Sequence, residues 1–378
     1  MREIKNKELK TNLFLMIASV IFCFLLLEAI FIIADNYNYG HSYIPHKYDD
    51  NLGWKFIPNT SGHYYRKEFD AKYNINSDGF ADDDFSVNKN VNEKRIFIFG
   101  DSFMAAMEVD ITNTTHMLLE KKLKESDENF EVYNFGIPGY GTDQYMVALK
   151  KYAPIYKPDI VIFSMLTAND LKNIDYDMES EKCKPFFKLN ESKLELIPFD
   201  CDKTRRENIR FLRKSNVLDF IYRQISVIRI KSSINDNKKQ IPINFYIYES
   251  GNPKFNDSFL LNEKIILEAK KYCQTIGSEF VLVVLTNSVQ IDEEKWNKTM
   301  EEYPLMKDKV WNLEYPEERI NQSCKKDSIN CLFLLEPFKE HTAQTGDKMH
   351  WYYDSHWNDK GHKLAAEEIH NYLITKII

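Results

Sequence analysis

Residues 95–102 of this 378-residue chain read Arg-Ile-Phe-Ile-Phe-Gly-Asp-Ser. The apolar run from Ile96 to Phe99 is short and uninterrupted, which predicts a strand buried on both faces. Gly100 ends this strand, and Ser102 follows at a turn from strand to helix. A serine at such a turn is lifted to the edge of a sheet, where its hydroxyl is accessible for chemistry. The stretch therefore predicts both a buried strand and a candidate nucleophile.

The same alternation of apolar strand and helix continues to the end of the chain, from residue 94 to residue 378. We expect further strands at residues 130–133, 159–165, 279–285 and 331–335, and helices at residues 112–124, 142–152, 262–276 and 359–374. Continuous apolar strands that alternate with helices are typical of a parallel sheet covered on both faces. The sequence predicts an α/β domain of three layers over residues 94–378.

Residues 172–261 interrupt this alternation. Residues 186–189 and 193–196 predict a hairpin, and residues 216–232 look helical. An insertion between the third and fourth strands lies at the carboxyl edge of the sheet, where open α/β sheets bind ligands. We interpret it as a lid or substrate-shaping element, with a surface extension as the alternative. Residues 35–93 predict an irregular or short-stranded N-terminal extension.

The N-terminus has the composition of a membrane anchor. Residues 13–34 are apolar except for Ser19 and Glu28, and about 20 residues cross the hydrocarbon core. Four basic residues precede them: Arg2, Lys5, Lys7 and Lys10. Positive charge on that side keeps residues 1–12 in the cytoplasm. We expect a single-pass protein of the cytoplasmic membrane with its main domain in the periplasm or outside the cell.

Three other interpretations of the apolar stretch are open. A cleaved signal peptide needs small residues at the cut, whereas Ile32 and Ile33 precede Ala34. Lipoprotein processing at Cys23 needs a small residue before it, and Phe22 stands there. A buried soluble helix is rarely apolar all round.

Charge and cysteine content exclude several classes of protein. The net charge of −7 argues against a dedicated nucleic-acid binder. Export permits disulfides, and we expect Cys183 to pair with Cys201 and Cys324 with Cys331, leaving Cys273 unpaired; five free thiols are the alternative. No spacing of cysteines or histidines predicts a metal site, and we expect no cofactor.

Four segments carry residues suited to chemistry. They are Gly-Asp-Ser-Phe at 100–103, Asn-Phe-Gly-Ile-Pro-Gly at 134–139, Thr-Ala-Asn-Asp at 167–170 and Asp-Ser-His-Trp at 354–357. The first three each follow a predicted strand, so they fall on one edge of a parallel sheet. The fourth precedes the closing helix and can reach the same edge.

In order and spacing, these segments resemble those of the SGNH, or GDSL-like, hydrolase superfamily, over about residues 94–378. This resemblance implies a flavodoxin-like three-layer fold. Residues 51–59, Asn-Leu-Gly-Trp-Lys-Phe-Ile-Pro-Asn, are similar to a stretch of membrane-anchored bacterial members often linked to surface polysaccharides.

The resemblance implies a role for five residues. Ser102 matches the nucleophile, His356 the general base and Asp354 the residue that orients the base. The backbone N–H groups of Ser102 and Gly139 and the side chain of Asn169 match the donors of an oxyanion hole, which acyl transfer needs at the developing alkoxide.

Two positions depart from the family pattern. Thr167 replaces a usual glycine, which removes no donor. Asp354 lies two residues before His356 rather than three, with Tyr353 in the third position; in an extended segment residues i and i+2 point the same way. The Asp-x-His-Trp pattern resembles the alginate O-acetyltransferase branch of the superfamily.

Other residues near these motifs have competing interpretations. Gly136 is the rival of Gly139 as an oxyanion donor, and His350 and His362 are the rivals of His356. Asp101 and Asp170 are more typical of loop and cap residues than of catalytic ones. Four aromatic residues are more typical of a core than of a sugar platform: Trp351, Tyr352, Tyr353 and Trp357.

Three functions follow as hypotheses. The first is a membrane-anchored serine esterase that hydrolyses acyl esters, on envelope carbohydrate or a related ester. The second is an O-acyltransferase that acts on an envelope polysaccharide, with a sugar instead of water accepting the acyl group. The third is a polysaccharide-assembly protein that keeps the fold for binding alone. In each case the expected partners are an acyl ester or carbohydrate and the lipid bilayer.

Overall fold

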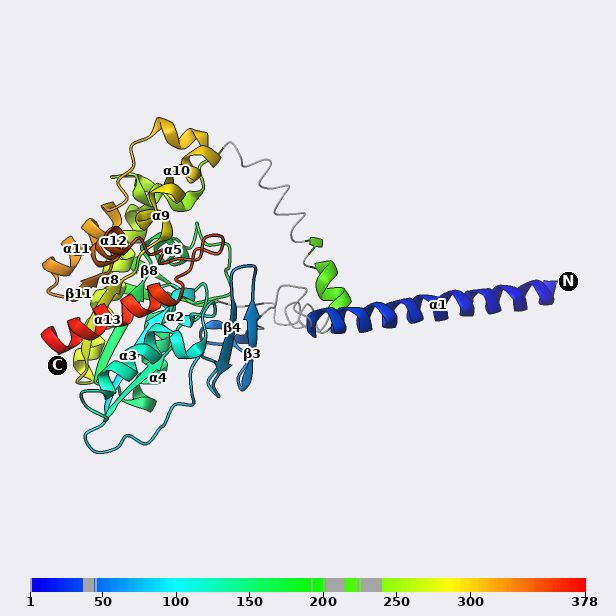
Figure 1. Cartoon of the computed structure of the whole chain (residues 1–378), viewed down its shortest axis with the longest axis horizontal. Coiled ribbons are helices and arrows are strands. Elements are labelled where there is room, and N and C mark those ends of the chain that lie inside the picture. Colours follow the sequence, from blue (N-terminus) through cyan, green and yellow to red (C-terminus); the bar gives the residue numbers. More distant parts are fainter. Residues whose placement is uncertain are drawn as a thin grey trace. The chain divides into compact units, whose positions relative to one another are not determined.

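The computed structural model describes residues 2–36, 44, 46–191, 193–199, 201, 215–222, 224–225 and 240–378. The chain divides into two compact units (Figure 1). One consists of residues Met1–His41 and Cys201–Lys238, and the other of Ser42–Asp200 and Lys239–Ile378.

The first unit contains the helix α1 (Arg2–Asn36). Its segment Lys10–Ile33 has a mean hydropathy of 2.8, so it is long and apolar enough to cross a membrane. The Glu28 carboxylate accepts hydrogen bonds from the backbone N–H groups of Asn216 and Val217, at 2.7 and 3.1 Å. Residues 216–222 and 224–225 are helical, as expected, and Glu28 caps their first turn. The remainder of the helix expected at 216–232 lies outside the described residues.

The second unit is built on a five-stranded parallel sheet in the order β6-β5-β7-β10-β11. The strands are β5 (Lys94–Gly100), β6 (Phe130–Asn134), β7 (Ile160–Met165), β10 (Glu279–Val284) and β11 (Asn330–Phe333). Numbered along the chain, this order is 2-1-3-4-5, the flavodoxin-like arrangement, in which the order of the strands reverses between the first and third strands. The predicted α/β fold with a flavodoxin-like parallel sheet is confirmed.

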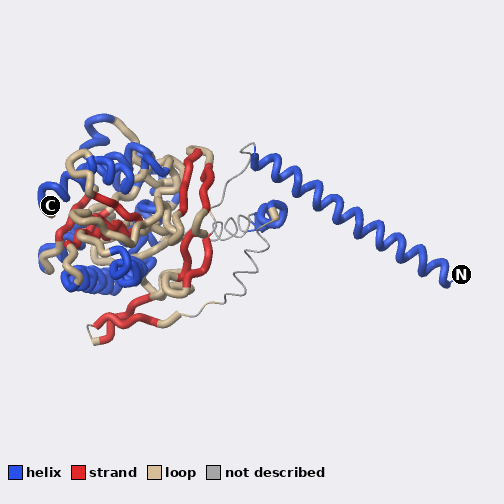
Figure 2. The backbone as a smooth tube through the Cα atoms, turned by 90° about the horizontal axis from the view of Figure 1, so that it is seen from below, coloured by secondary structure: helices blue, strands red, loops and turns tan. Residues whose placement is uncertain are grey.

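Helices cover both faces of this sheet, which completes the three layers (Figures 1 and 2). One face carries α4 (Thr142–Tyr156), α8 (Asn256–Thr275) and α11 (Tyr315–Lys326), and the other carries α3 (Thr115–Lys124), α12 (Leu335–Thr345) and α13 (Asp359–Lys376). Alternate residues of β5 serve the two faces, because successive strand side chains point to opposite sides: Phe97 and Phe99 join the α4 side, Ile96 and Ile98 the α13 side.

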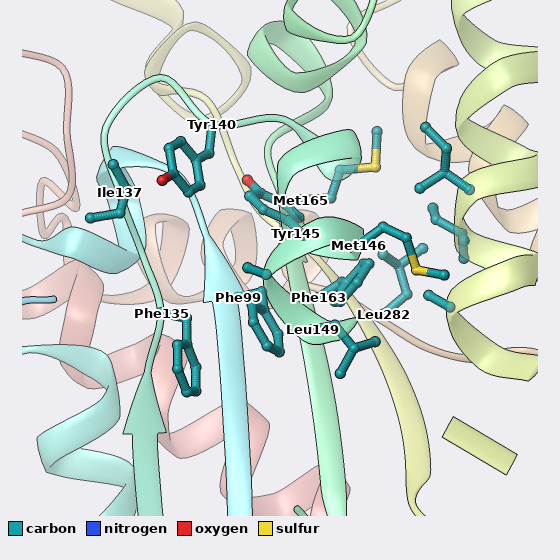
Figure 3. Close-up of a cluster of buried hydrophobic side chains, with 14 of the residues drawn as sticks. Phe99, Phe135, Ile137, Tyr140, Tyr145, Met146, Leu149, Phe163, Met165 and Leu282 are labelled. Carbon is teal, nitrogen blue, oxygen red and sulfur yellow. The ribbon is translucent and has the colours of Figure 1, made fainter. Parts of the chain in front are cut away.

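The α4 side of the sheet is rich in aromatic residues (Figure 3). Phe99 stacks on Phe135 with ring centroids 4.8 Å apart, and Phe163 meets Tyr145 of α4 edge to face at 5.6 Å. All four side chains are fully buried or nearly so. This packing holds the carboxyl ends of β5, β6 and β7 in fixed relation to one another.

Residues of the expected N-terminal extension pack onto this domain. They form two antiparallel hairpins, β1 (His46–Asp49) with β2 (Gly53–Phe56) and β3 (Thr60–Tyr65) with β4 (Asp70–Ile75). The side chains of Leu52, Phe56 and Phe80 are fully buried in the hydrophobic cluster that contains Phe99 and Phe135. The extension therefore shares the hydrophobic core of the α/β domain.

The insertion contains the expected hairpin, β8 (Phe186–Asn190) with β9 (Lys193–Ile197). It is anchored to the domain by Lys184, whose buried ammonium lies 2.9 Å from the buried carboxylate of Asp143 on α4. The short helices η2 (Ile243–Tyr248) and η3 (Pro253–Phe255) then lead into α8. The interpretation of this insertion as a lid stays a prediction.

Several boundaries differ from the sequence-based expectation. The expected helix at 112–124 is a short turn, η1 (Ile111–Asn113), followed by α3, and α4 continues through Pro154 to Tyr156. The pattern did not predict several helical elements, among them α5 (Thr167–Asn173), α9 (Ser288–Ile291), α12, α10 (Glu293–Glu302), η4 (Pro304–Asp308) and α11. The last three are highly charged or short, so they carry a weak apolar period.

The expected bond between Cys324 on α11 and Cys331 on β11 is confirmed. Cys183, in this unit, and Cys201, in the first unit, are each disulfide-bonded as well. Cys273 is a free, buried thiol on α8.

Candidate active site

The turn after β5 presents Ser102 at the sheet edge. Asp101 caps the one-turn helix α2 (Ser102–Ala105), because its carboxylate accepts the backbone N–H of Phe103 at 2.9 Å. Ala106 then adopts a left-handed conformation, with φ at 51°, and its N–H donates to the carbonyl of Ser102. This tight turn leaves the Ser102 side chain partly exposed while its neighbours are buried.

The structure brings Ser102, His356 and Asp354 into one hydrogen-bonded chain. The Oγ of Ser102 lies 2.7 Å from Nε2 of His356. On the other side of the ring, Nδ1 of His356 is hydrogen-bonded to Oδ1 of Asp354. This is the order of contacts that a nucleophile, a general base and an orienting carboxylate require. The spacing of two residues between Asp354 and His356 is therefore compatible with contact.

A second carboxylate, Glu108, lies beside the imidazole. Its Oε1 is 3.6 Å from Nδ1 of His356, and its side chain is only 7% exposed. Its Oε2 is buried and has no hydrogen-bond partner in the described part of the chain. Glu108 was not among the residues predicted from sequence, although it is the one charged residue in the apolar stretch 103–109.

These contacts shift the pKa values of the three groups. Burial raises the pKa of Glu108, and the nearby charge of His356 only partly opposes that rise. Burial also disfavours the charged form of His356, but the charges of Glu108 and Asp354 and the hydrogen bond that the ring donates to Asp354 outweigh it and raise the pKa to about 9. Partial burial acts against ionised Asp354, yet its contacts with His356 hold its pKa below the usual value.

The same three side chains are the one set of metal-type ligands that the described residues bring within 4.8 Å of one another: Glu108, Asp354 and His356. Hydrogen bonds join Asp354, His356 and Ser102, and Glu108 lies beside the imidazole without a hydrogen bond to it.

The loop that carries Asp354 and His356 is a closed turn. The N–H of Trp351 donates to the carbonyl of His356 at 2.8 Å, and the N–H of Ser355 returns to the carbonyl of Trp351 at 3.0 Å. Ser355 has a φ of 78°, a left-handed conformation that reverses the chain direction. After the turn, Trp357 is fully buried and its Nε1 donates to Oγ1 of Thr286. Buried Trp357 thus anchors the partly exposed His356.

Gly139 fits the role of an oxyanion donor and Gly136 does not. The N–H of Gly136 already donates to the Asn134 side chain at 2.9 Å, and a Cβ on Gly136 would lie 2.5 Å from the backbone nitrogen of Ala105. Gly136 is thus required for close packing. Within the described residues, the N–H groups of Gly139 and Ser102 have no hydrogen-bond partner. Gly139 has a φ of 80°, which glycine adopts without strain.

An N-terminal tryptophan supports the Gly139 turn. Nε1 of Trp54 donates to the carbonyl of Pro138 at 3.0 Å, and the Tyr140 hydroxyl donates to the carbonyl of Trp54. Trp54 belongs to the stretch 51–59 that carried part of the family resemblance.

Asn169, on α5 just after β7, is oriented by Asp101. One amide N–H of Asn169 donates to Oδ2 of Asp101 at 3.1 Å. A primary amide has two N–H donors, so one remains for a ligand. Asp170 is fully buried and accepts the Tyr145 hydroxyl at 3.0 Å; burial, and then the charge of Asp101, hold its pKa well above the usual value. Asp101 and Asp170 therefore brace the site.

Neither of the rival histidines contacts Ser102. The His350 ring is partly buried, with Nε2 3.4 Å from the carbonyl of Thr286, and loss of solvent lowers its pKa to about 3. His362, inside α13, contacts the hydroxyl of Thr115 at 2.8 Å, and burial lowers its pKa to about 3 as well.

The aromatic stripe around His356 divides into two kinds of residue. Trp357 is core, as expected. The core interpretation is wrong for Tyr352 and Tyr353, which are 41% and 65% exposed beside Asp354.

Comparisons with known proteins give a fold-level likeness only. No protein-family model matches the chain, and no curated protein matches it. Among solved structures it is similar to the acetyl xylan esterase AlAXEase, with a TM-score of 0.40 and 11% identity over 75% of this chain and 100% of that one.

Two further structures are similar over comparable lengths. A lipolytic protein of the G-D-S-L family from Veillonella parvula DSM 2008 has a TM-score of 0.37 and 11% identity over 75% of this chain and 99% of that one. A two-domain esterase (CEX) active on acetylated mannans has a TM-score of 0.39 and 11% identity over 75% of this chain and 49% of that one. Because these TM-scores are below 0.5, we argue function from the residues of this chain alone.

Proposed function

We propose that this protein is a serine esterase of the SGNH type. The observation that carries the proposal is the hydrogen-bonded chain from Ser102 through His356 to Asp354 at the carboxyl edge of a parallel sheet. The N–H groups of Ser102 and Gly139, which have no partner in the described part of the chain, follow two neighbouring strands, and Asn169 follows the next strand. The four sequence motifs and this geometry support the same chemistry.

In the first half of the reaction, the ester is cleaved and the acyl group moves to the enzyme. Oγ of Ser102 attacks the carbonyl carbon while its proton passes to Nε2 of His356. The carbonyl oxygen becomes negative and accepts hydrogen bonds from the backbone N–H groups and the Asn169 amide. The C–O bond to the leaving alcohol then breaks, and the alkoxide takes the proton from His356. An acyl-Ser102 ester remains.

In the second half, an acceptor removes the acyl group. For an esterase the acceptor is water: His356 takes one of its protons, the hydroxide adds to the acyl carbon, and the proton returns to Oγ of Ser102 as the carboxylic acid leaves. A sugar hydroxyl in place of water makes the same site an O-acyltransferase. The Asp-x-His-Trp pattern and the exposed tyrosines beside it favour this as the second candidate.

We further propose that the enzyme is anchored in the cytoplasmic membrane by α1 and acts on envelope carbohydrate outside it. The segment Lys10–Ile33 supports the anchor, and the basic residues before it support a cytoplasmic N-terminus. The Cys324–Cys331 bridge supports an oxidising compartment. A role in binding alone is disfavoured, because a binder has no use for the complete Ser102–His356–Asp354 arrangement.

One experiment tests the chemistry and separates its two forms. Purified full-length protein in detergent is incubated with an acetylated oligosaccharide, with and without an unacetylated acceptor, alongside a Ser102→Ala variant. Release of acetate that depends on Ser102 supports the esterase, and acetylation of the acceptor supports the transferase. An inactive wild-type protein whose Ser102 also fails to react with a fluorophosphonate probe contradicts both.

A further inference from the structure

Two exposed tyrosines form a platform next to the triad. The rings of Tyr352 and Tyr353 meet edge to face with centroids 5.0 Å apart, and Asp354 follows them directly. Exposed aromatic pairs offer a large, rigid contact area at low cost in side-chain entropy.

The backbone under these tyrosines is fixed from two sides. The carboxylate of Glu68 accepts the N–H groups of both Tyr352 and Tyr353 at 2.8 Å. Nζ of Lys295 donates to the carbonyl of Tyr352 at 3.1 Å and to the hydroxyl of Ser355. The tyrosine platform is therefore preorganised, which lowers the entropy lost when a ligand binds.

Two lysines flank the platform without an acidic partner. Nζ of Lys67 lies 4.0 Å from the Tyr353 ring centroid, and Nζ of Lys298 donates to the Tyr352 hydroxyl at 2.6 Å. Neither ammonium has a carboxylate within 4 Å among the described residues, in a chain whose net charge is −7. Unpaired positive charge around an aromatic surface is complementary to an anionic ligand.

We propose that Tyr352, Tyr353, Lys67 and Lys298 form a subsite for the carbohydrate chain of the ester substrate, and that this chain is anionic, carrying carboxylate groups. This inference rests on the proposed function for its reaction, but binding at the subsite is measurable without turnover. The tyrosine rings contact sugar rings, and the lysines select for carboxylates. The adjacent Asp354–His356–Ser102 chain then meets an acyl group on a neighbouring sugar.

Binding is tested by lysine footprinting on full-length Ser102→Ala protein in phosphatidylcholine nanodiscs. An amine-reactive reagent labels the lysines, with and without oligogalacturonate, and mass spectrometry reads each site. We expect protection of Lys67 and Lys298 by oligogalacturonate and weaker protection by neutral xylo-oligosaccharide. Lys182 is the matched control, because its Nζ lies 4.2 Å from the ring of Tyr176, another half-exposed tyrosine.

Selectivity is tested by kinetics on acetylated forms of the same two oligosaccharides. In Lys67→Gln/Lys298→Gln protein, the ratio of kcat/KM for the anionic over the neutral substrate should fall by about tenfold, the size expected for two partly exposed ion pairs. In Tyr352→Ala/Tyr353→Ala protein, kcat/KM should fall for both substrates. Lys182→Gln should leave the ratio unchanged.

The results that would contradict the proposed subsite differ from those that would contradict the proposed esterase activity. Absence of protection by oligogalacturonate, or equal protection of Lys182, overturns it even in a fully active enzyme. Protection of Lys67 and Lys298 by phosphatidylglycerol in the nanodisc, with none by oligosaccharide, assigns the platform to the lipid surface and also overturns it. If the wild-type protein has no esterase activity but the protection is found, the subsite stands and the reaction alone is refuted.

Discussion

Glu68 accepts the backbone N–H of Asp354 at 3.0 Å, so a turn between β3 and β4 holds the loop that orients the candidate base. Residues 35–93 looked like a leading extension in sequence, yet one of them positions a residue 286 places further along the chain. The same extension supplies Trp54, which braces the Gly139 turn. The triad and the oxyanion turn both depend on it.

The first prediction concerns Glu68. Glu68→Gln replaces one carboxylate oxygen with a donor that faces the N–H groups of Tyr353 and Asp354, so the loop should shift. We expect kcat on a small ester such as p-nitrophenyl acetate to fall by about tenfold or more with KM little changed, because small misplacements of catalytic groups are costly in rate. Asp70→Asn is the control: Asp70 lies in the same hairpin but pairs with His63. Equal losses in both variants would contradict a positioning role.

The second prediction concerns the triad as a unit. Ser102→Ala and His356→Ala should each remove most turnover, and the double variant should be scarcely worse than either, because groups that act together give non-additive losses. Asp354→Asn should also lose activity. His350→Gln and His362→Gln should retain most of it, since neither ring contacts Ser102. Additive losses measured in the double variant would refute a shared mechanism.

The strands could be predicted from sequence to within one or two residues, because an uninterrupted apolar run of five to seven residues has few alternatives. The residues at the strand ends could be predicted too, since parallel topology brings Ser102, Gly139 and Asn169 to one edge. The helices between β10 and β11 could not be predicted. For example, α10 has no buried residue, so its sequence has no apolar stripe that would indicate a helix.

Contacts between distant parts of the chain were also beyond prediction. Nothing local marks Glu68 as the partner of a loop near residue 354. The sequence shows Glu108 as a single charge in an apolar stretch, but only the fold shows that its carboxylate lies beside His356. The tyrosines at 352 and 353 were grouped with Trp357 because the sequence shows no difference in their burial.

The third prediction concerns the oxyanion donors. Asn169→Ala should lower kcat by about 10²–10³, the usual loss for one oxyanion donor. Because Asn169 also donates to Asp101, the thermal stability of the variant is measured alongside. Asn169→Asp is a second test: it keeps the size of the side chain but turns a donor into an acceptor, so it should be no better than alanine. A variant with near-normal kcat would exclude Asn169 as a donor.

The fourth prediction concerns topology. A reporter enzyme that works only outside the cytoplasm, fused after Ile378, should be active, and the protein should resist extraction from membranes at alkaline pH. Deleting residues 2–36 should release the remainder from the membrane. A reporter that is active only in the cytoplasm would refute the proposed orientation, and a soluble, N-terminally trimmed product would refute the anchor.

The last prediction is the pH dependence. His356 must be neutral to accept the Ser102 proton, and its pKa is raised to about 9. The rate constant kcat/KM should therefore rise with pH through the neutral range and level off only in the alkaline range, above the usual histidine value near 6.5. The group responsible for much of this rise is Glu108, whose negative charge stabilises the imidazolium.

Glu108→Gln removes that charge at constant size. The imidazolium is then no longer stabilised by the negative charge of Glu108, so the pKa of His356 falls. The midpoint of the pH–rate profile should move to lower pH by about one unit, as expected for a charge at this distance. The other groups that act on His356 remain: Asp354 and Asp101 favour its charged form. Glu317→Gln is the control, since Glu317 is a buried carboxyl that faces Gln290. A folded Glu108→Gln protein with an unmoved midpoint would show that Glu108 is neutral whenever His356 carries its proton.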